Sequence, residues 1–191
     1  MRGTYSSNDD KVLDEQFREM KDCGCDVVVV GWYPIDSSDQ KETKWGGFQD
    51  KNIAKLLEAC EKHGLKLTFH IEPYKGRCAD TLREDLEYLR KNYGGHNSFY
   101  RQNGLPMYYV YDSYLSPKED WSRLLKKEGQ ISIRNTPLDC LMIGLYVDST
   151  HKEFLIEGGF GSLYFNHIFN FLLFPKKLRR CVHLFWLRII L

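Results

Sequence analysis

Five amphipathic segments of this chain each end at a glycine, and continuous apolar runs lie between them. Glycine just past a helix adopts the left-handed conformation without a Cβ penalty, so each of these glycines is typical of a helix end. Successive glycines are 40, 30, 35 and 29 residues apart, which is about the length of one strand-helix unit. We therefore expect repeated strand-helix units. The glycines are Gly24, Gly64, Gly94, Gly129 and Gly158.

The runs between these glycines are continuously apolar rather than alternating. Strands that are buried on both faces have this pattern, which is typical of parallel sheets. Apolar residues at helical spacing in 53–60 and 82–93 predict the helices that separate the strands. Residues 161–165 are a candidate for a fifth strand. The four clear runs are Val27 to Val30, Leu65 to Ile71, Met107 to Tyr111 and Cys140 to Val147.

This order of elements favours a parallel α/β fold and, within that class, an incomplete (β/α)8 TIM-type barrel. An open doubly wound sheet is disfavoured because no Gly-rich phosphate-binding fingerprint follows any of the runs. A complete barrel usually takes about 250 residues, whereas this chain has 191, of which 26 follow Phe165. We therefore expect about five strand-helix units and no closed eight-stranded barrel.

The charge distribution divides the chain after Glu157. The formal net charge is +1, but the residues beyond Glu157 contain five Lys and Arg, no acidic residue, and six of the eleven Phe. We therefore expect a barrel part over residues 1–165 and a divergent basic, Phe-rich tail of doubtful structure over 166–191. No apolar run reaches the roughly 20 residues that cross a bilayer, and the sequence begins without a targeting signal.

The cysteines predict neither a disulfide scaffold nor a metal site. Six Cys in 191 residues are too few for a disulfide-rich domain. No C-x-x-C pair and no Cys/His cluster has the spacing of a zinc site. We interpret the cysteines as buried reduced thiols and expect neither a metal nor a cofactor.

Aromatic and acidic residues gather where the apolar runs end. In parallel α/β folds the carboxyl ends of the strands carry the ligand site. Aromatic rings pack on the C–H-rich faces of sugars, and carboxylates accept hydrogen bonds from sugar hydroxyls. Lys and Arg, which would indicate a nucleic-acid partner, do not mark these ends. The candidate sugar contacts are Trp32, Tyr33, His70, Glu72, Tyr74, Tyr109, Tyr111, Asp112 and Tyr114.

Each of these residues also has a purely structural interpretation. Tyr and Trp commonly fill barrel rims, and His70 alone is more typical of a hydrogen-bonded core histidine. Glu72 follows an apolar strand, where a carboxylate must be paired or positioned for function, and Asp112 has the same character. Glycoside hydrolysis normally uses two carboxylates about 5–9.5 Å apart. Glu72 and Asp112 are a candidate catalytic pair if their strands are neighbours.

Four stretches at these strand ends resemble glycoside hydrolase family 99, the endo-α-1,2-mannosidases. They occur in the family's order and at family-like spacing, from about Gly3 to Phe165. Several long motifs in register are far more specific than one short pattern. The stretches are GWYP at 31–34, LTFHIEPY at 67–74, LPMYYVYDSY at 105–114 and SIRNTP at 132–137.

The resemblance implies a (β/α)8 barrel that cleaves α-1,2-mannosidic bonds inside glucosylated high-mannose N-glycans, so the implied partner is an oligosaccharide. It implies retention of configuration with help from the substrate's own 2-hydroxyl, without metal or cofactor. It also implies a Golgi membrane protein that acts on the lumenal side and is held by an N-terminal anchor. Glu72 and the aromatic residues around it match family positions that line the sugar pocket, so the resemblance makes them substrate contacts.

The sequence departs from the family beyond Phe165. The family's two catalytic glutamates lie in a Glu-Trp-His-Glu-type segment, and no such segment occurs here. The family's anchor and first strand correspond to sequence upstream of Met1. We therefore expect an endomannosidase-like chain that is inactive alone, with Glu72 and Asp112 as a weaker alternative catalytic pair. Two further alternatives are a non-catalytic carbohydrate-binding remnant and an unstable fragment from a partial gene model.

Overall fold

The computed structural model describes residues 9–34, 46–165 and 184–187, and alternates helices with strands along most of that length. A short antiparallel strand and a 3-10 turn interrupt the alternation around the fourth strand. The elements are α1 (Asp10–Asp22), β1 (Val27–Trp32), α3 (Gly46–His63), β2 (Lys66–Ile71), α4 (Ala79–Asn92), β3 (Arg101–Gln102), β4 (Leu105–Val110), η1 (Ser113–Leu115), α5 (Lys118–Leu125), β5 (Leu141–Tyr146), α6 (His151–Gly158), β6 (Ser162–Phe165) and β7 (Leu184–Leu187).

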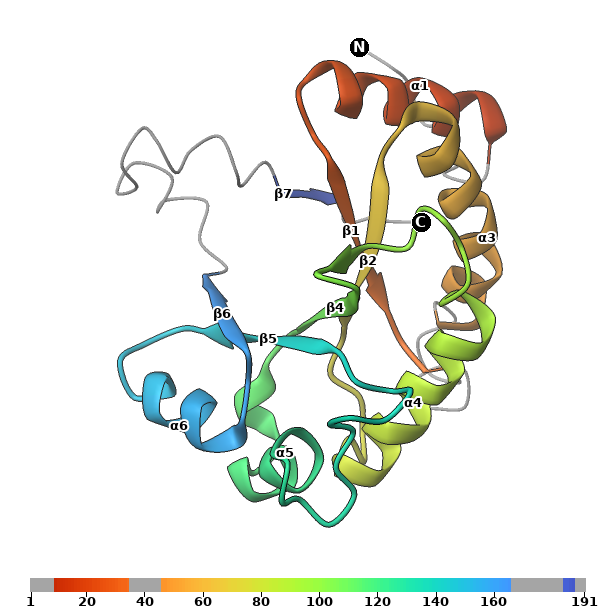
Figure 1. Ribbon diagram of the computed structural model, residues 1–191. Coiled ribbons are helices and arrows are strands. Elements are labelled where there is room, and N and C mark those ends of the chain that lie inside the picture. The colour runs from red at the N-terminus through yellow and green to blue at the C-terminus, as the bar shows by residue number, and fades with distance from the viewer. Residues whose placement is uncertain (1–8, 35–45, 166–183, 188–191) are drawn as a thin grey trace.

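The strands form one sheet in the order β6-β5-β4-β2-β1-β7, and every neighbouring pair in this order is parallel. β3 lies off this path and pairs antiparallel with β4. Helices α1, α3 and α4 lie along one side of the sheet, and α5 and α6 lie near β4 and β5 (Figure 1). The predicted parallel α/β fold is confirmed. In the described part of the chain the barrel is not closed, because β6 and β7 are not paired with each other.

Alternate residues of each strand face opposite sides of the sheet, which creates two apolar layers. One layer lies between sheet and helices and contains residues such as Val28, Phe69 and Tyr108. The other layer, on the inner face, contains Val29, Met107, Tyr109 and Ile143. The inner layer is small because Gly31, Thr68 and His70 occupy inner positions of β1 and β2. The polar side chains of the inner face therefore lie toward the carboxyl ends of these strands.

The glycine pattern is right for three helix ends, because α1, α3 and α4 each end one or two residues before Gly24, Gly64 and Gly94. Gly24 and Gly64 have positive φ angles of 84° and 66°, and the Gly94 N–H donates to the carbonyls of Leu89 and Arg90. After α6 the left-handed position falls on Gly159 rather than Gly158. Helix α5 ends at Leu125, four residues before Gly129, because Lys126 is already extended. Gly129 serves a close backbone approach instead, since a Cβ there would lie 2.1 Å from the Arg123 carbonyl oxygen.

Part of the predicted tail joins the sheet. Residues Leu184–Leu187 form β7, which pairs parallel with β1 from Val27 opposite Leu184. The rest of the tail after Phe165 lies outside the described residues. Among the helices that the structure describes, none has the length and apolar character to cross a membrane.

Candidate functional site

His70, Glu72 and Tyr111 meet at the carboxyl ends of β2 and β4. His70 Nδ1 lies 3.1 Å from Glu72 Oε1, and the side chains of His70 and Glu72 are 1% and 14% exposed. The ring of Tyr111 packs against the ring of His70 with centroids 5.1 Å apart. An ionised carboxylate only accepts hydrogen bonds, so an ionised Glu72 requires the proton on His70 Nδ1. The imidazole thereby holds one carboxylate oxygen in place.

The backbone fixes Glu72 and Tyr111 just beyond the strands that carry them. Glu72 N donates to the Trp32 carbonyl at 3.0 Å, and Tyr111 N donates to the Ile71 carbonyl at 3.0 Å. These two bonds continue the parallel ladders of β1 with β2 and of β2 with β4 by one step. Glu72 and Tyr111 are therefore placed by sheet register rather than by a loop.

Gly31 makes room for the Glu72 carboxylate. Gly31 pairs with His70 in the β1–β2 register. A Cβ at position 31 would lie 2.8 Å from Glu72 Oε1, which is too close for two unbonded atoms. The sequence analysis did not identify Gly31 as a site residue. The available signal was a glycine inside an otherwise β-branched strand, a pattern that often marks close approach of another group.

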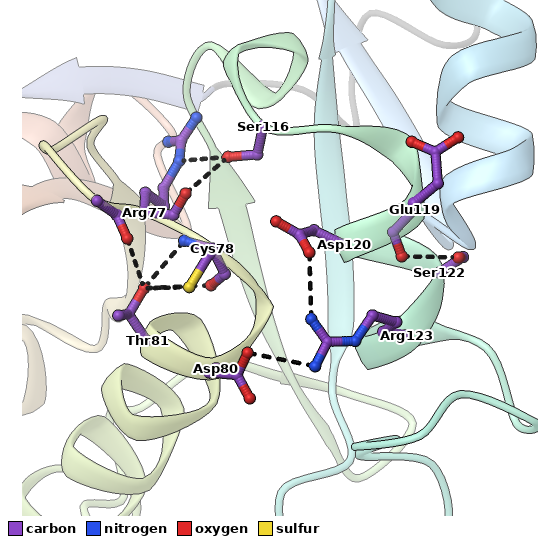
Figure 2. A network of polar contacts seen from close by, with 10 residues as sticks. Arg77, Cys78, Asp80, Thr81, Ser116, Glu119, Asp120, Ser122 and Arg123 are labelled. Atoms are coloured by element: carbon purple, nitrogen blue, oxygen red, sulfur yellow. Dashed lines mark hydrogen bonds and ion pairs between the residues drawn. The ribbon is translucent and has the colours of Figure 1, made fainter.

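Arg77 supports the turn that follows β4, and the sequence analysis missed it as well. Its guanidinium donates to the carbonyl of Tyr111 at 2.8 Å and to the carbonyl of Asp112 at 2.5 Å. Arg77 Nε also donates to Ser116 Oγ at 3.4 Å, and Figure 2 shows the Arg77–Ser116 contact. Burial lowers the pKa of Arg77, while nearby groups that include Asp112 and Glu72 raise it. Arg77 thus brings a positive charge beneath a rim that carries carboxylates.

The same region is tied together by contacts between α4 and α5. Arg123 of α5 pairs with Asp80 of α4 at 3.3 Å and with Asp120 at 3.3 Å. Thr81 accepts a hydrogen bond from the backbone N–H of Cys78 at the start of α4. Figure 2 shows these contacts together with Arg77. The support beneath the rim therefore comes from two successive strand-helix units.

Asp112 and Tyr114 form a second, more exposed polar pair. Asp112 adopts the left-handed conformation with φ 45° and ψ 47°. Tyr114 donates its hydroxyl to Asp112 Oδ1 at 2.8 Å, and this bond is the main cause of the raised pKa of Tyr114. The Tyr114 ring stacks on the His151 ring with centroids 4.7 Å apart and is 39% exposed. A carboxylate beside an open aromatic face is suited to contact with a sugar.

Two other predicted contacts, Trp32 and Tyr74, point away from this cluster, and a third, Tyr109, lies beside it. Trp32 is buried against the helices: its Nε1 donates to Asp50 Oδ1 at 3.0 Å and its ring stacks on Tyr88. The reason is strand parity, because Trp32 follows the inward-facing Gly31 by one residue. Tyr74 donates its hydroxyl to Asp85 of α4 at 2.5 Å. Tyr109 is buried in the inner apolar layer and pairs with His70 in the β2–β4 register.

Tyr33 and the proposed catalytic pair remain as predictions. Tyr33 directly follows β1 and is half-buried. β2 precedes Glu72 and β4 precedes Asp112. These two strands are neighbours, which is the condition that the proposed catalytic pair had to meet. Extension of their register places Glu72 beside Tyr111, and Asp112 follows one residue later. Among the residues that the structure describes, no three His, Cys, Asp or Glu side chains converge to hold a metal ion.

A parallel sheet with flanking helices, and with a carboxylate, a histidine and aromatic rings at its carboxyl edge, is typical of α/β-barrel enzymes, whose sites lie at this edge. Comparison with known sequences identifies the member of that class. The chain belongs to glycosyl hydrolase family 99, whose sequence model matches residues 1–174. The members of this family to which the chain is similar are glycoside hydrolases.

The chain is similar to several relatives over most of its length. It is 39% identical to the glycoprotein endo-alpha-1,2-mannosidase of Xenopus laevis and 36% identical to that of Rattus norvegicus, in each case over 167 residues and 85% of this chain. The match covers 36% and 35% of those relatives, so the chain spans about a third of their length.

Solved structures show the same relationship. The GH99 endo-alpha-mannosidase from Bacteroides thetaiotaomicron superposes with a TM-score of 0.77 at 33% identity. The superposition covers 86% of this chain and 46% of that one. This confirms that the strand-helix units described above are those of a family 99 barrel.

Proposed function

We propose that this chain carries part of the substrate site of an endo-α-1,2-mannosidase that acts on glucosylated high-mannose N-glycans. The observation that carries the proposal is the Glu72 carboxylate, which lies over Gly31 and is held by His70 beside the Tyr111 ring. The similarity to endo-alpha-1,2-mannosidases, at 36–39% identity, supports the bond specificity.

Glu72 acts in this proposal as an acceptor for sugar hydroxyls. Its Oε1 is held by His70, so the remaining acceptor positions of a partly exposed carboxylate are available to a ligand. Tyr111 and Tyr114 offer aromatic faces on either side of Asp112 in the sequence. Arg77 holds the carbonyls of Tyr111 and Asp112, so it positions the contact residues without contacting the sugar.

The reaction proposed for the whole enzyme is retaining. The substrate 2-hydroxyl attacks the anomeric carbon while one carboxylate accepts its proton and the glycosidic C–O bond breaks. A carboxylic acid protonates the leaving oxygen, and water then opens the epoxide-like intermediate. The residues for these steps belong to a Glu-Trp-His-Glu-type segment that this sequence does not contain. We therefore propose that this chain alone binds sugar but does not hydrolyse it, and that the whole enzyme acts on the lumenal side of Golgi membranes.

Calorimetry with a glucosyl-α-1,3-mannose ligand tests the binding step. Glu72→Gln removes a charged acceptor, and a hydrogen bond to a charged group is worth about 1.5–3 kcal/mol. We therefore expect Kd to rise about tenfold to a hundredfold. Glu58→Gln, a neutralisation on the exposed surface of α3, is the matched control and leaves Kd unchanged. Absence of binding heat with folded protein would overturn the proposal.

A non-catalytic carbohydrate-binding role is the second candidate, and the aromatic and carboxylate rim around Glu72 favours it. Release of mannose oligosaccharide from a glucosylated N-glycan by the whole protein distinguishes the two, because the first proposal expects release by the whole protein and only binding by this chain. Binding without release by the whole protein supports a binding module. Release by this chain alone that is lost in both Glu72→Gln and Asp112→Asn would instead identify these carboxylates as the alternative catalytic pair.

A further inference from the structure

A cavity lies at the opposite end of β4 from the His70–Glu72–Tyr111 cluster. Its volume is about 540 Å³, within the range of roughly 300–1,000 Å³ that small-molecule sites occupy. The walls come from the last turns of α4, the β3–β4 hairpin and the segment 136–139 that leads into β5. All of these segments lie at the amino ends of β4 and β5, so the cavity is distinct from the site at the carboxyl ends.

The polar lining of this cavity is mainly cationic. Arg90, Lys91 and Arg101 line it, and no ion pair joins any of them to a carboxylate in the described ranges of the chain. The acidic lining residue is Asp139, which is already paired with Arg134 at 2.8 Å and accepts the Asn135 N–H at 2.9 Å. Three cations therefore face the cavity without local neutralisation, and an anion would find a favourable potential there.

A buried phenol in the wall has no partner within the described residues. Tyr108 is 2% exposed and lines the cavity, yet no hydrogen bond to its hydroxyl is formed in the part of the chain that the structure describes. The rings of Phe69 and Phe99 lie 6.4 and 5.9 Å from the Tyr108 ring and fix its orientation. In the described part of the chain the buried side-chain atoms without a partner are Ser113 Oγ and Arg123 Nε, and the Tyr108 hydroxyl is not one of them. The hydroxyl therefore opens toward the cavity, where a ligand oxygen can accept its hydrogen bond.

Two cations lie close enough to Tyr108 to affect its ionisation. Burial raises the pKa of Tyr108 strongly, and the positive charges of Arg101 and Arg90 act in the opposite direction. Arg101 is held over the Phe99 ring at 5.5 Å, and its guanidinium donates to the carbonyls of Phe99 and Gly94. One cation is therefore fixed beside the phenol, and the more exposed Arg90 and Lys91 lie at the outer end of α4.

We propose that this cavity binds a small organic phosphate monoester. Arg90, Lys91 and Arg101 neutralise the phosphate, and the Tyr108 hydroxyl donates to one of its oxygens. A doubly charged phosphate neutralises more of the positive charge of three cations than a single carboxylate would. The planar guanidinium of arginine can also donate two parallel hydrogen bonds to phosphate oxygens. Leu86, Phe99 and Pro137 give the same cavity apolar surface for the organic part of the ligand. This site does not depend on the proposed hydrolase function.

Titration calorimetry with phenyl phosphate tests the site on the full chain. We expect saturable binding that weakens with added salt, weaker binding of inorganic phosphate, and no binding of benzyl alcohol. Tyr108→Phe removes one oxygen and Arg90→Gln removes one exposed charge, and each should raise Kd about tenfold. Lys152→Gln, an exposed charge on α6, should leave Kd unchanged.

Two results would overturn the proposal. One is that phenyl phosphate does not bind to protein that shows a folded circular dichroism spectrum. The other is that binding is equal for wild type, Tyr108→Phe and Arg90→Gln, which would show an adventitious anion on the surface. Because Arg90 is exposed, the Arg90→Gln result remains informative even if Tyr108→Phe changes the core.

Discussion

Gly31 shows how one missing side chain creates the candidate site. Gly31→Ala would bring a methyl group to 2.8 Å from Glu72 Oε1, so the carboxylate must move. Overpacking of this kind costs about 1–3 kcal/mol, and Glu72 would lose its bond to His70. We expect at least tenfold weaker binding of the glucosyl-mannose ligand by calorimetry, together with a lower midpoint of urea unfolding.

Gly95→Ala is the matched control for that substitution. A Cβ at position 95 would meet no atom within 4 Å, and the φ of Gly95 is not in the left-handed region. Binding and stability should stay within error of the wild type. Equal ligand affinity in Gly31→Ala and Gly95→Ala would show that the position of Glu72 is unimportant for binding.

The carboxyl of Asp85 should make folding stability depend on pH. Burial raises its pKa from 3.8 to about 7, while the hydrogen bond from Tyr74 opposes the rise. Between these two values the folded state holds a proton that the unfolded state has released, so stability falls as pH rises from about 4 to 7. One pKa unit corresponds to about 1.4 kcal/mol, which limits the loss to about 4 kcal/mol.

Urea unfolding at several pH values checks this expectation. Asp85→Asn keeps an acceptor for Tyr74 but cannot ionise, so its unfolding free energy should fall less steeply with pH than that of the wild type. The difference between the two slopes isolates Asp85 from the other groups that titrate in this range. Parallel slopes would mean that Asp85 is ionised in the folded protein throughout.

At the scale of elements, Arg77 acts as a clamp between the loop before α4 and the turn after β4. Its planar guanidinium reaches two carbonyls and Ser116 at once, whereas a lysine ammonium cannot span these acceptors. Arg77→Lys should therefore loosen η1 while leaving the strands intact. We expect faster amide hydrogen exchange at Leu115 and Ser116, whose N–H groups bond within this turn.

Arg83→Lys provides the comparison for that substitution. Arg83 also donates from α4 to loop carbonyls, those of Ile131 and Ser132, but far along the chain from η1. Its replacement should speed exchange near residue 131 and leave the η1 amides unchanged. If Arg77→Lys and Arg83→Lys affect the η1 amides equally, Arg77 has no special role in this turn.

The elements could largely be predicted from the sequence, because each apolar run coincides with a strand to within about two residues. The run from Val27 to Val30 lies in β1, and the run from Cys140 to Val147 contains β5. The site was predicted less well. Trp32 faces the helices and bonds to Asp50 because alternate residues of a strand face opposite sides of the sheet. A continuous apolar run has no polar alternation, so the sequence does not show which residues face inward.

Arg77 shows a second limit of sequence patterns. It lies in a polar loop between β2 and α4, where an arginine is ordinarily solvated, and its partners are 34 to 39 residues away along the chain. Such long-range contacts have no local signature. In contrast, His70 and Glu72 are two residues apart, at and just beyond the end of β2, and share a face by parity. A local pattern could therefore have indicated their contact, although the sequence analysis did not predict it.

At the scale of the whole molecule, one apolar core joins nearly all the described elements. Buried side chains from α1 to β5, including Phe17, Leu57, Leu86 and Trp121, belong to a single contiguous cluster. A core shared by successive units couples their unfolding, because loss of one unit exposes the apolar face of the next. We therefore expect one cooperative thermal transition, despite a barrel that is not closed among the described residues.

Circular dichroism in the near and far ultraviolet measures this transition. Trp121 is buried against Phe160, so its near-ultraviolet signal reports tertiary packing, while the far-ultraviolet signal reports the helices. Coincident midpoints for the two signals would exclude the unstable fragment that the sequence left as an alternative. A broad far-ultraviolet change with no near-ultraviolet signal at 25 °C would mean that the chain collapses without specific packing. In that case both proposed binding sites would require further polypeptide to form.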